Sequence, residues 1–191
     1  MPSATLGAVP LTSLTDRTAV VTGGASGIGR ALALLFAREG AHVVVADLDE
    51  AGMAETVAGV SRAGRRGLAV KTDVSRLADV QALANRAFGE FGAVHVVCNN
   101  AGIALWGGLE SVTHKDWEWA MGVNLWGVIH GVEAFVPRMV AGKQPGHACH
   151  PGDARDASHH GSTSTRSLTY EWLDHHTYSS SKVGPPGPDW T

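Results

Sequence analysis

The amino-acid sequence predicts an α/β fold built on a doubly wound parallel sheet that is incomplete on its C-terminal side. From residue 18 to about 142, short β-branched runs alternate with longer segments of helical period, which is typical of successive βα units. A glycine-rich turn joins the first such run to the first helical segment, and the composition changes abruptly after His147. With 191 residues, the chain is long enough for a single domain with its own core.

Two βα units and a third strand are expected in the first part of the chain. Apolar residues recur with helical spacing after the first strand and form one face of the first helix: Ile28, Leu32, Leu35 and Phe36. The elements expected in order are a strand over 19–22, a helix ending at Gly40, a strand over 42–46, a helix over 50–62 and a weaker strand over 68–70.

A third helix and a fourth strand follow in the same pattern. We expect Asp73 or Ser75 to cap this helix at its start. The fourth strand is expected over 94–98. Apolar residues at steps of three or four predict a helix stripe that faces the sheet: Leu77, Val80, Ala84, Phe88 and Phe91.

A long helical region is expected after the fourth strand. Thr113 and Asp116 have the spacing of a capping box, which indicates where a helix begins. Apolar residues then recur with helical period as far as Met139, and Pro137 is expected to kink the helix.

The segment 147–191 differs in character from the rest of the chain. It holds six of the ten histidines and many Ser, Thr and Pro residues, with few branched aliphatic ones. A central parallel strand needs a nearly continuous apolar run, so this segment predicts no fifth buried strand. We therefore expect a folded domain over 1–147 and an irregular or disordered tail over 148–191. A frame change, mis-splicing or truncation near His147 is a hypothesis that would explain the shift.

The glycine-rich turn is the first candidate binding element. It lies between a strand and a helix, where backbone N–H groups can approach a pyrophosphate at the positive end of the helix and side chains would block that approach. A flexible turn with incidental glycines is the alternative. The candidate cofactor-binding residues in the turn are Gly23, Ser26, Gly27, Ile28 and Gly29.

Asp47 is the second candidate, because it ends the second strand 18 residues after Gly29. A carboxylate there can accept hydrogen bonds from the adenosine ribose hydroxyls and repel a 2′-phosphate, which favours NAD over NADP. The neighbouring Leu48 belongs to the same candidate site. Arg30 would suit NADP instead, and Asp47 could also simply cap the following helix together with Asp49.

Four motifs in this order resemble those of the short-chain dehydrogenase/reductase (SDR) family. They are the Gly-x-x-x-Gly-x-Gly turn, Asp73-Val74, Asn99-Asn100-Ala101-Gly102 and Asn124-Leu125-Trp126-Gly127, and the resemblance covers residues 18–147. It implies a Rossmann-like fold in which Asp73 and Val74 contribute to the adenine site. It also implies that Asn100, Ala101 and Gly102 shape the cofactor cleft, although this motif could be a plain turn.

The resemblance also implies a set of catalytic residues. Asn124 resembles the family's catalytic Asn, which holds a water in a proton relay; the alternative is an Asn that faces solvent. Tyr178 and Lys182 resemble the Tyr-x-x-x-Lys pair, in which the ammonium lowers the phenol pKa so that Tyr178 can transfer the alcohol proton. Lys182 would also hold the nicotinamide ribose. Ser164 is one of several hydroxyl residues that could bind the substrate oxygen, and the Tyr/Lys spacing could be a coincidence.

These residues together imply an oxidoreductase that transfers a hydride between NAD and a small alcohol or ketone. One alternative is a catalytically inactive, dinucleotide-binding remnant of such an enzyme. Another is an interaction protein that uses the sheet edge left exposed where a fifth strand would lie. The resemblance allows a homo-oligomer, provided that the sixth strand and the substrate loop, which the family has and this sequence lacks, were present.

The composition of the chain excludes some classes of partner and predicts its cellular compartment. The net charge of −3 offers no basic excess for a nucleic-acid partner. Cys98 and Cys149 show neither metal-ligand spacing nor a disulfide framework, and the first 17 residues lack a secretory signal, so we expect a cytoplasmic protein. No apolar run is long enough for a membrane span, and the paired histidines of the last segment have no accompanying pattern of a metal site.

Overall fold

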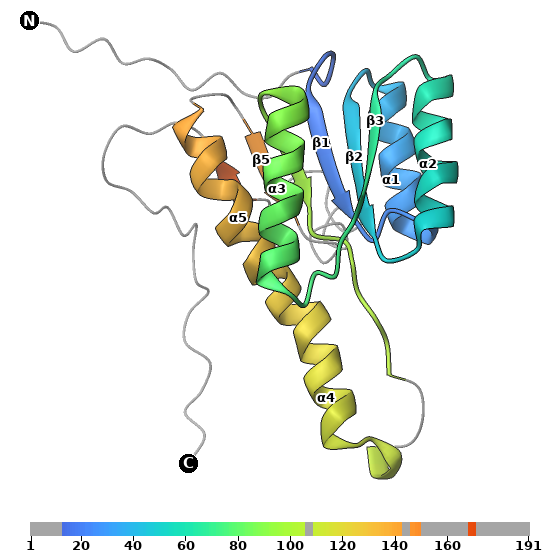
Figure 1. The fold of residues 1–191 in the computed structure, drawn as a ribbon, viewed down its shortest axis with the longest axis vertical. Coiled ribbons are helices and arrows are strands. Elements are labelled where there is room, and N and C mark those ends of the chain that lie inside the picture. Colours follow the sequence, from blue (N-terminus) through green and yellow to red (C-terminus); the bar gives the residue numbers. More distant parts are fainter. Residues whose placement is uncertain (1–12, 106–108, 143–145, 150–167, 171–191) are drawn as a thin grey trace, which may run out of the picture.

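The computed structural model describes residues 13–105, 109–142, 146–149 and 168–170 (Figure 1). The strands are β1 (Thr18–Thr22), β2 (His42–Asp47), β3 (Gly67–Lys71), β4 (Val96–Cys98), β5 (Gly146–Cys149) and β6 (Leu168–Tyr170). The helices are α1 (Gly27–Arg38), α2 (Glu50–Arg62), α3 (Leu77–Phe91), α4 (His114–Met121) and α5 (Gly127–Ala141), with a 3₁₀ turn at Leu109–Ser111 and a π-helical stretch, η2, at Gly122–Trp126.

The strands form one sheet in the order β3-β2-β1-β4-β5-β6. Every neighbouring pair from β3 to β5 is parallel, and β6 is antiparallel to β5. Helices α1 and α2 cover one face, whereas α3 and α5 cover the other (Figure 1). The predicted α/β doubly wound parallel sheet is therefore confirmed.

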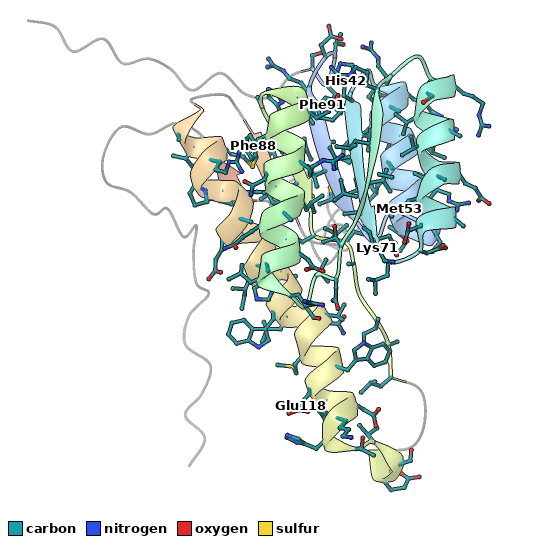
Figure 2. The ribbon with its side chains drawn as sticks, in the orientation of Figure 1. His42, Met53, Lys71, Phe88, Phe91 and Glu118 are labelled. Carbon is teal, nitrogen blue, oxygen red and sulfur yellow. The ribbon has the colours of Figure 1, made fainter. Side chains whose placement is uncertain are left out.

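Two buried cores lie on the two faces of the sheet. The core under α1 and α2 contains Met53 and the β-branched residues of β1 and β2 that point to that side. The core under α3 and α5 contains Leu83, Phe135 and Met139, with Phe88 partly buried against it. Figure 2 shows Met53 and Phe88 on these opposite sides of the sheet.

Helix α1 contacts the sheet mainly through small residues, whereas Leu32 and Phe36 of the predicted apolar face are partly buried against the core. Its buried residues are Gly29, Ala33 and Ala37, which recur every four positions. Ile28 is 70% exposed and Leu35 is 49% exposed, so the predicted apolar face is wrong at these two positions. Small side chains on the buried face let the helix axis approach the sheet closely, and this moves the larger residues to the edges of the contact.

Helix α3 begins at Leu77 without a capping side chain, contrary to the expectation for Asp73 or Ser75. The N-cap position is Arg76, which makes no side-chain capping hydrogen bond. The Asp73 carboxylate instead accepts hydrogen bonds from Ser75 N and Ser75 Oγ, at 3.0 and 2.6 Å. Such local bonds compete with capping for the same carboxylate oxygen. The predicted stripe is confirmed at Val80 and Ala84, which are buried against the sheet.

The long helical region after β4 begins as the sequence predicts. Thr113 and Asp116 form a reciprocal capping box at the start of α4. The helix then runs through the π-helical stretch η2 into α5, which contains Pro137. Helix α4 projects beyond the carboxyl edge of the sheet (Figure 1). In the described ranges, no helix has both the length and the apolar character that crossing a membrane requires.

The prediction that no fifth strand follows residue 146 is wrong. β5 pairs in parallel with β4, and Ala148 is 4% exposed in the core. Its four residues have a weak strand pattern of their own, but β4 supplies the partner: His147 N donates to His95 O at 2.8 Å. The edge of β4 is consequently covered, which removes the structural basis of the proposed docking edge. The other residues of the predicted tail, apart from β6, lie outside the described ranges.

Candidate functional site

A cleft of about 500 Å³ lies at the carboxyl edge of the sheet, where β1, β2 and β4 end. In doubly wound sheets ligands bind outside this edge, at the point where the strand order reverses. All twelve residues predicted to bind a cofactor line this one cleft: Gly23, Ser26, Gly27, Ile28, Gly29, Asp47, Leu48, Asp73, Val74, Asn100, Ala101 and Gly102. The parallel sheet thus gathers four separated segments of the chain.

The three motif glycines serve different needs. A Cβ on Gly29 would lie 2.0 Å from Gly23 O, so the start of α1 can pack against the turn only without a side chain there. A Cβ on Gly23 would lie 2.8 Å from Ala101 Cα, and Gly23 also has a φ of 66°. At Gly27 the space is open, and the requirement is the φ of 52°, which L side chains rarely adopt.

The first turn of α1 faces this cleft with its backbone N–H groups available. Ser26 is the N-cap residue and makes no capping hydrogen bond through its side chain, and the first turn contains no acidic residue. The unpaired N–H groups and the helix dipole give this end a partial positive charge. The geometry therefore fits a phosphate group, as the glycine pattern suggested.

Asp47 is held in place at the end of β2 by three backbone N–H groups. Its Oδ2 accepts from Ala25 N at 3.0 Å, and its Oδ1 accepts from Leu48 N at 2.7 Å and from Asp49 N at 3.2 Å. A carboxylate offers about four acceptor positions, so Oδ2 retains one for a ligand hydroxyl. The alternative that Asp47 caps α2 is excluded, because Asp49 is the N-cap and accepts from Gly52 N.

Arg30 is turned away from ligand recognition by its own contacts. Its Nε donates to Ala25 O at 2.9 Å, a terminal nitrogen donates to Gly52 O at 3.3 Å, and the other pairs with Glu55 at 2.9 Å. Among the described residues, the charged ones that line the cleft are Asp47 and Asp73, and none of the lining residues is Lys or Arg. The cleft therefore carries negative side-chain charge, with its positive contribution coming from the start of α1.

Asn100 and Thr22 join the ends of β1 and β4. Asn100 Nδ2 donates to Thr22 O at 2.9 Å and to Gly23 O at 3.3 Å. Thr22 Oγ1 donates to Cys98 O at 3.3 Å and accepts from Ala101 N at 3.0 Å. The Asn-Asn-Ala-Gly segment is thus bonded to the glycine turn across the sheet, which a plain turn would not require.

Val74 is positioned in the cleft by helix α5. Its carbonyl accepts a hydrogen bond from His130 Nδ1 at 2.9 Å. A Cβ on Gly127 would lie 2.8 Å from Val74 Cγ2, so the helix packs directly on this residue. The wall formed by Val74 is therefore fixed by contacts with a distant part of the chain.

Asn124 lies in the π-helical stretch and is bonded to the chain that follows β4. Its Oδ1 accepts from Ile103 N, and its Nδ2 donates to Ile103 O, both at 2.9 Å. The side chain therefore holds the loop after Gly102 at the cleft, and both polar groups of its amide are engaged. π-Helical stretches often occur at functional sites.

The remaining predicted catalytic residues, Ser164, Tyr178 and Lys182, lie outside the described ranges. In the part of the chain that the structure describes, no group of His, Cys, Asp or Glu residues could hold a metal ion.

Several cleft residues were missed by the sequence reasoning. Thr72 and Ser75 flank the predicted Asp73-Val74 pair, so their proximity in sequence was a usable signal. Trp119 and Val123 are four residues apart on the helical region, which places them on one face. Nothing local indicates that this face borders the cleft, because that depends on where α4 packs.

Comparison with known proteins agrees with this geometry. The sequence profile described as short chain dehydrogenase matches residues 17–148. A 1-deoxy-11-beta-hydroxypentalenate dehydrogenase of Streptomyces avermitilis is 41% identical over 140 residues, which cover 70% of this chain and 50% of that protein. A C alpha-dehydrogenase of a Sphingobium species is 38% identical over 133 residues, which cover 69% of this chain and 44% of that protein.

Solved structures give the same result. A short chain dehydrogenase/reductase of Burkholderia phymatum, crystallised in complex with NAD, is 43% identical with a TM-score of 0.70, covering 72% of this chain and 49% of that one. Levodione reductase is 32% identical with a TM-score of 0.67, covering 71% of this chain and 54% of that one. This chain spans about half the length of the curated relatives it matches, so its sheet is incomplete relative to theirs. By the profile match over most of its length, the chain belongs to the short-chain dehydrogenase/reductase family.

Proposed function

We propose that this chain binds NAD in the cleft and contributes the dinucleotide-binding part of an oxidoreductase that interconverts an alcohol and a carbonyl compound. One observation carries the proposal: the uncapped start of α1 faces the same cleft as the Asp47 carboxylate. A positive helix end and a carboxylate at the end of the next strand suit the two chemically different parts of a dinucleotide, its pyrophosphate and its adenosine ribose.

In this proposal, each wall of the cleft binds a different part of the dinucleotide. The N–H groups of Gly27, Ile28 and Gly29 hold the pyrophosphate, and Asp47 Oδ2 accepts from a ribose hydroxyl. Asp73 and Val74 border the adenine. Asn100, Ala101 and Gly102 lie across the cleft and border the nicotinamide end.

The charges of the cleft favour NAD over NADP. A 2′-phosphate would meet the Asp47 carboxylate, and among the described residues that line the cleft there is no Lys or Arg to neutralise it. Arg30, the candidate for that task, already bonds Ala25 O and Gly52 O and pairs with Glu55. Moving its guanidinium to a phosphate would break all of these contacts, which makes NADP the weaker ligand.

The bound dinucleotide supplies the hydride acceptor or donor. The residues of this chain would transfer the alcohol proton and position the substrate. Asn124 holds the loop at Ile103 beside the cleft. Tyr178 would transfer the alcohol proton, Lys182 would lower the phenol pKa, and Ser164 would donate to the substrate oxygen. These last three roles rest on the family resemblance alone.

The test is to measure the dissociation constants of NADH and NADPH for the purified chain by calorimetry. We expect tighter binding of NADH, and we expect Asp47→Asn to weaken it about tenfold, because a hydrogen bond to a charged group contributes about 1.5–3 kcal/mol. The same change should improve NADPH binding relative to NADH. The matched control is Glu90→Gln, whose carboxylate pairs with Arg66 far from the cleft.

Binding of NADPH as tight as that of NADH, or unchanged NADH binding in Asp47→Asn, would contradict the proposal. Turnover is measured on the same preparations with a panel of alcohols and ketones. Activity that Tyr178→Phe abolishes while NADH binding is retained supports the enzyme. Tight NADH binding without any turnover supports the second candidate, the inactive binding remnant.

A further inference from the structure

Two cysteines far apart in the sequence face each other across neighbouring strands. Cys98 ends β4 and Cys149 ends β5, and they are direct partners in the parallel register. Their Sγ atoms are 3.0 Å apart, although the two residues are 51 positions apart in the sequence. Both are present as reduced thiols. Their spacing in the sequence does not predict this proximity.

We propose that Cys98 and Cys149 are a redox modification site, at which a peroxide converts the two thiols into a reversible disulfide that joins β5 to β4. Adjacent strands lie about 4.7–4.9 Å apart, which is inside the Cα separation of about 4.4–6.8 Å that disulfides require. The backbone is already held there, because Asn99 N donates to Cys149 O at 2.9 Å. Bond formation therefore needs no rearrangement of the sheet.

The different environments of the two thiols set the order of the steps. Cys98 is 4% exposed, and the hydrogen bond with Cys149, together with burial, raises the pKa of Cys98 well above its usual range. Cys149 is only half-buried, so a small oxidant reaches it first. Exposure and thiolate character together decide which cysteine is oxidised.

The chemistry balances with hydrogen peroxide as the oxidant. The Cys149 thiolate attacks one peroxide oxygen, the O–O bond breaks, and the leaving hydroxide takes up a proton to become water. The product is a sulfenic acid on Cys149. The Cys98 sulfur then attacks that sulfur, the S–S bond forms and the S–O bond breaks, and the oxygen leaves as a second water with the proton of the Cys98 thiol. Two thiols thereby lose two electrons and two protons.

The disulfide would stabilise the part of the sheet with the weakest sequence pattern. β5 has four residues, and the bond would close a loop that contains α4, η2 and α5. The Cys98 carbonyl accepts a hydrogen bond from Thr22 Oγ1, and Thr22 Oγ1 accepts one from Ala101 N. These two bonds link Cys98 to the cleft. Because the strands already stand in register, the bond should leave this link and the cleft unchanged.

The experiment treats the folded full chain with hydrogen peroxide, alkylates any remaining thiols with a maleimide, and analyses intact mass and proteolytic peptides. We expect the loss of two hydrogen atoms per chain, a peptide linking Cys98 to Cys149, and no maleimide on either residue. The Tm should rise by about 5–10 °C and return after dithiothreitol, as expected for closing a loop of this length in a domain of this size. NADH binding should change less than twofold.

Cys98→Ser and Cys149→Ser are the matched controls, and each should show neither the mass loss nor the rise in Tm. Maleimide on both thiols of the treated, folded chain would overturn the proposal. So would disulfides that link two chains, or an equal yield of the internal bond in denaturant, since the fold would then not be what brings the thiols together. The mass, alkylation and Tm readouts do not depend on cofactor binding.

Discussion

Ala25 in the glycine turn is held from both sides by charged side chains. Its N–H donates to Asp47 Oδ2 at 3.0 Å, and its carbonyl accepts from the Arg30 guanidinium. Arg30 is in turn bonded to Gly52 O and Glu55, so the turn is tied to α2 as well. Ordering a binding loop before the ligand arrives reduces the entropy lost on binding. The Arg30 contacts therefore support the binding site without touching the proposed ligand.

Replacing Arg30 tests this support. Arg30→Met keeps the apolar part of the side chain but removes the guanidinium donors to Ala25 O and Gly52 O, so we expect NADH binding to weaken about tenfold and stability to fall by about 1–3 kcal/mol. Calorimetry and urea unfolding measure the two effects. Arg30→Lys should restore part of each. Glu55→Gln removes only the ion pair, which is worth at most about 1 kcal/mol at the surface, and should bind NADH within about twofold of the original chain.

An Arg30→Met chain that binds NADH as tightly as the original would contradict the positioning role. Equal losses in Arg30→Met and Glu55→Gln would instead assign the effect to the ion pair with Glu55, not to the bonds with the backbone.

At the scale of elements, helices α1 and α5 bring glycine or alanine against the sheet at their closest contacts. In α5, Gly131 lies against Asn99 at the end of β4, where a Cβ would come 2.0 Å from Asn99 Oδ1. Asn99 is 4% exposed, and its Oδ1 has no hydrogen-bond partner among the described residues. A buried side chain has little room to move, so this helix position is restricted to glycine.

Two glycine substitutions in helices should therefore have opposite effects. Gly131→Ala is expected to destabilise the fold by about 1–3 kcal/mol, because the added methyl group overpacks the contact with Asn99. Gly89→Ala in α3 adds a methyl group that meets nothing within 4 Å, and it should stabilise the fold by about 0.5–1 kcal/mol through helix propensity. Chemical denaturation measures both. A neutral Gly131→Ala would show that α5 packs less tightly than the structure indicates.

At the scale of the whole molecule, the carboxyl and amino edges of the sheet carry different features. The carboxyl edge carries the cleft, whereas His42 at the start of β2 lies at the amino edge with Phe91, at a ring distance of 5.7 Å (Figure 2). His42 Nδ1 accepts from Arg66 N at 3.2 Å. Burial, then the charges of Arg66 and Arg65, lower the pKa of His42, with Asp16 opposing them. Burial also lowers the pKa of His147 in β5.

These lowered pKa values predict that stability falls as the solution becomes acidic. Below the ordinary value of 6.5 the unfolded chain binds protons at these histidines that the folded chain does not, so unfolding becomes more favourable until the pH reaches the lower folded-state pKa. The Asp116 pKa is lowered from 3.8 by its bonds to Thr113, so its contribution is lost only at more acidic pH.

We expect the Tm to fall between about pH 7.5 and about pH 5.5, and His42→Gln to make that fall smaller while His147 remains. Thermal unfolding followed by circular dichroism across this range is the measurement. A Tm that rises on acidification, or an identical slope in His42→Gln, would rule out these histidines as the cause.

The sequence by itself determined the α/β class, the first four strands and twelve of the residues that line the cleft. Strand and helix periods are local, and parallel strands bring their carboxyl ends to one edge whatever their order, so Gly23, Asp47, Asp73 and Asn100 had to lie near each other. The capping box at Thr113 is equally local, since both of its partners lie within one helical turn.

The tertiary structure alone decided the contacts between segments that are distant in the sequence. The short run from Gly146 to Cys149 becomes a strand because β4 offers it hydrogen bonds, and Cys98 consequently meets Cys149. The Arg30 guanidinium donates a hydrogen bond to the backbone of α2. Ile28 is exposed because glycine and alanine residues of α1 make its close contact with the sheet. Each outcome depends on which partner surface is available after folding, and the local pattern of a segment carries no information about that surface.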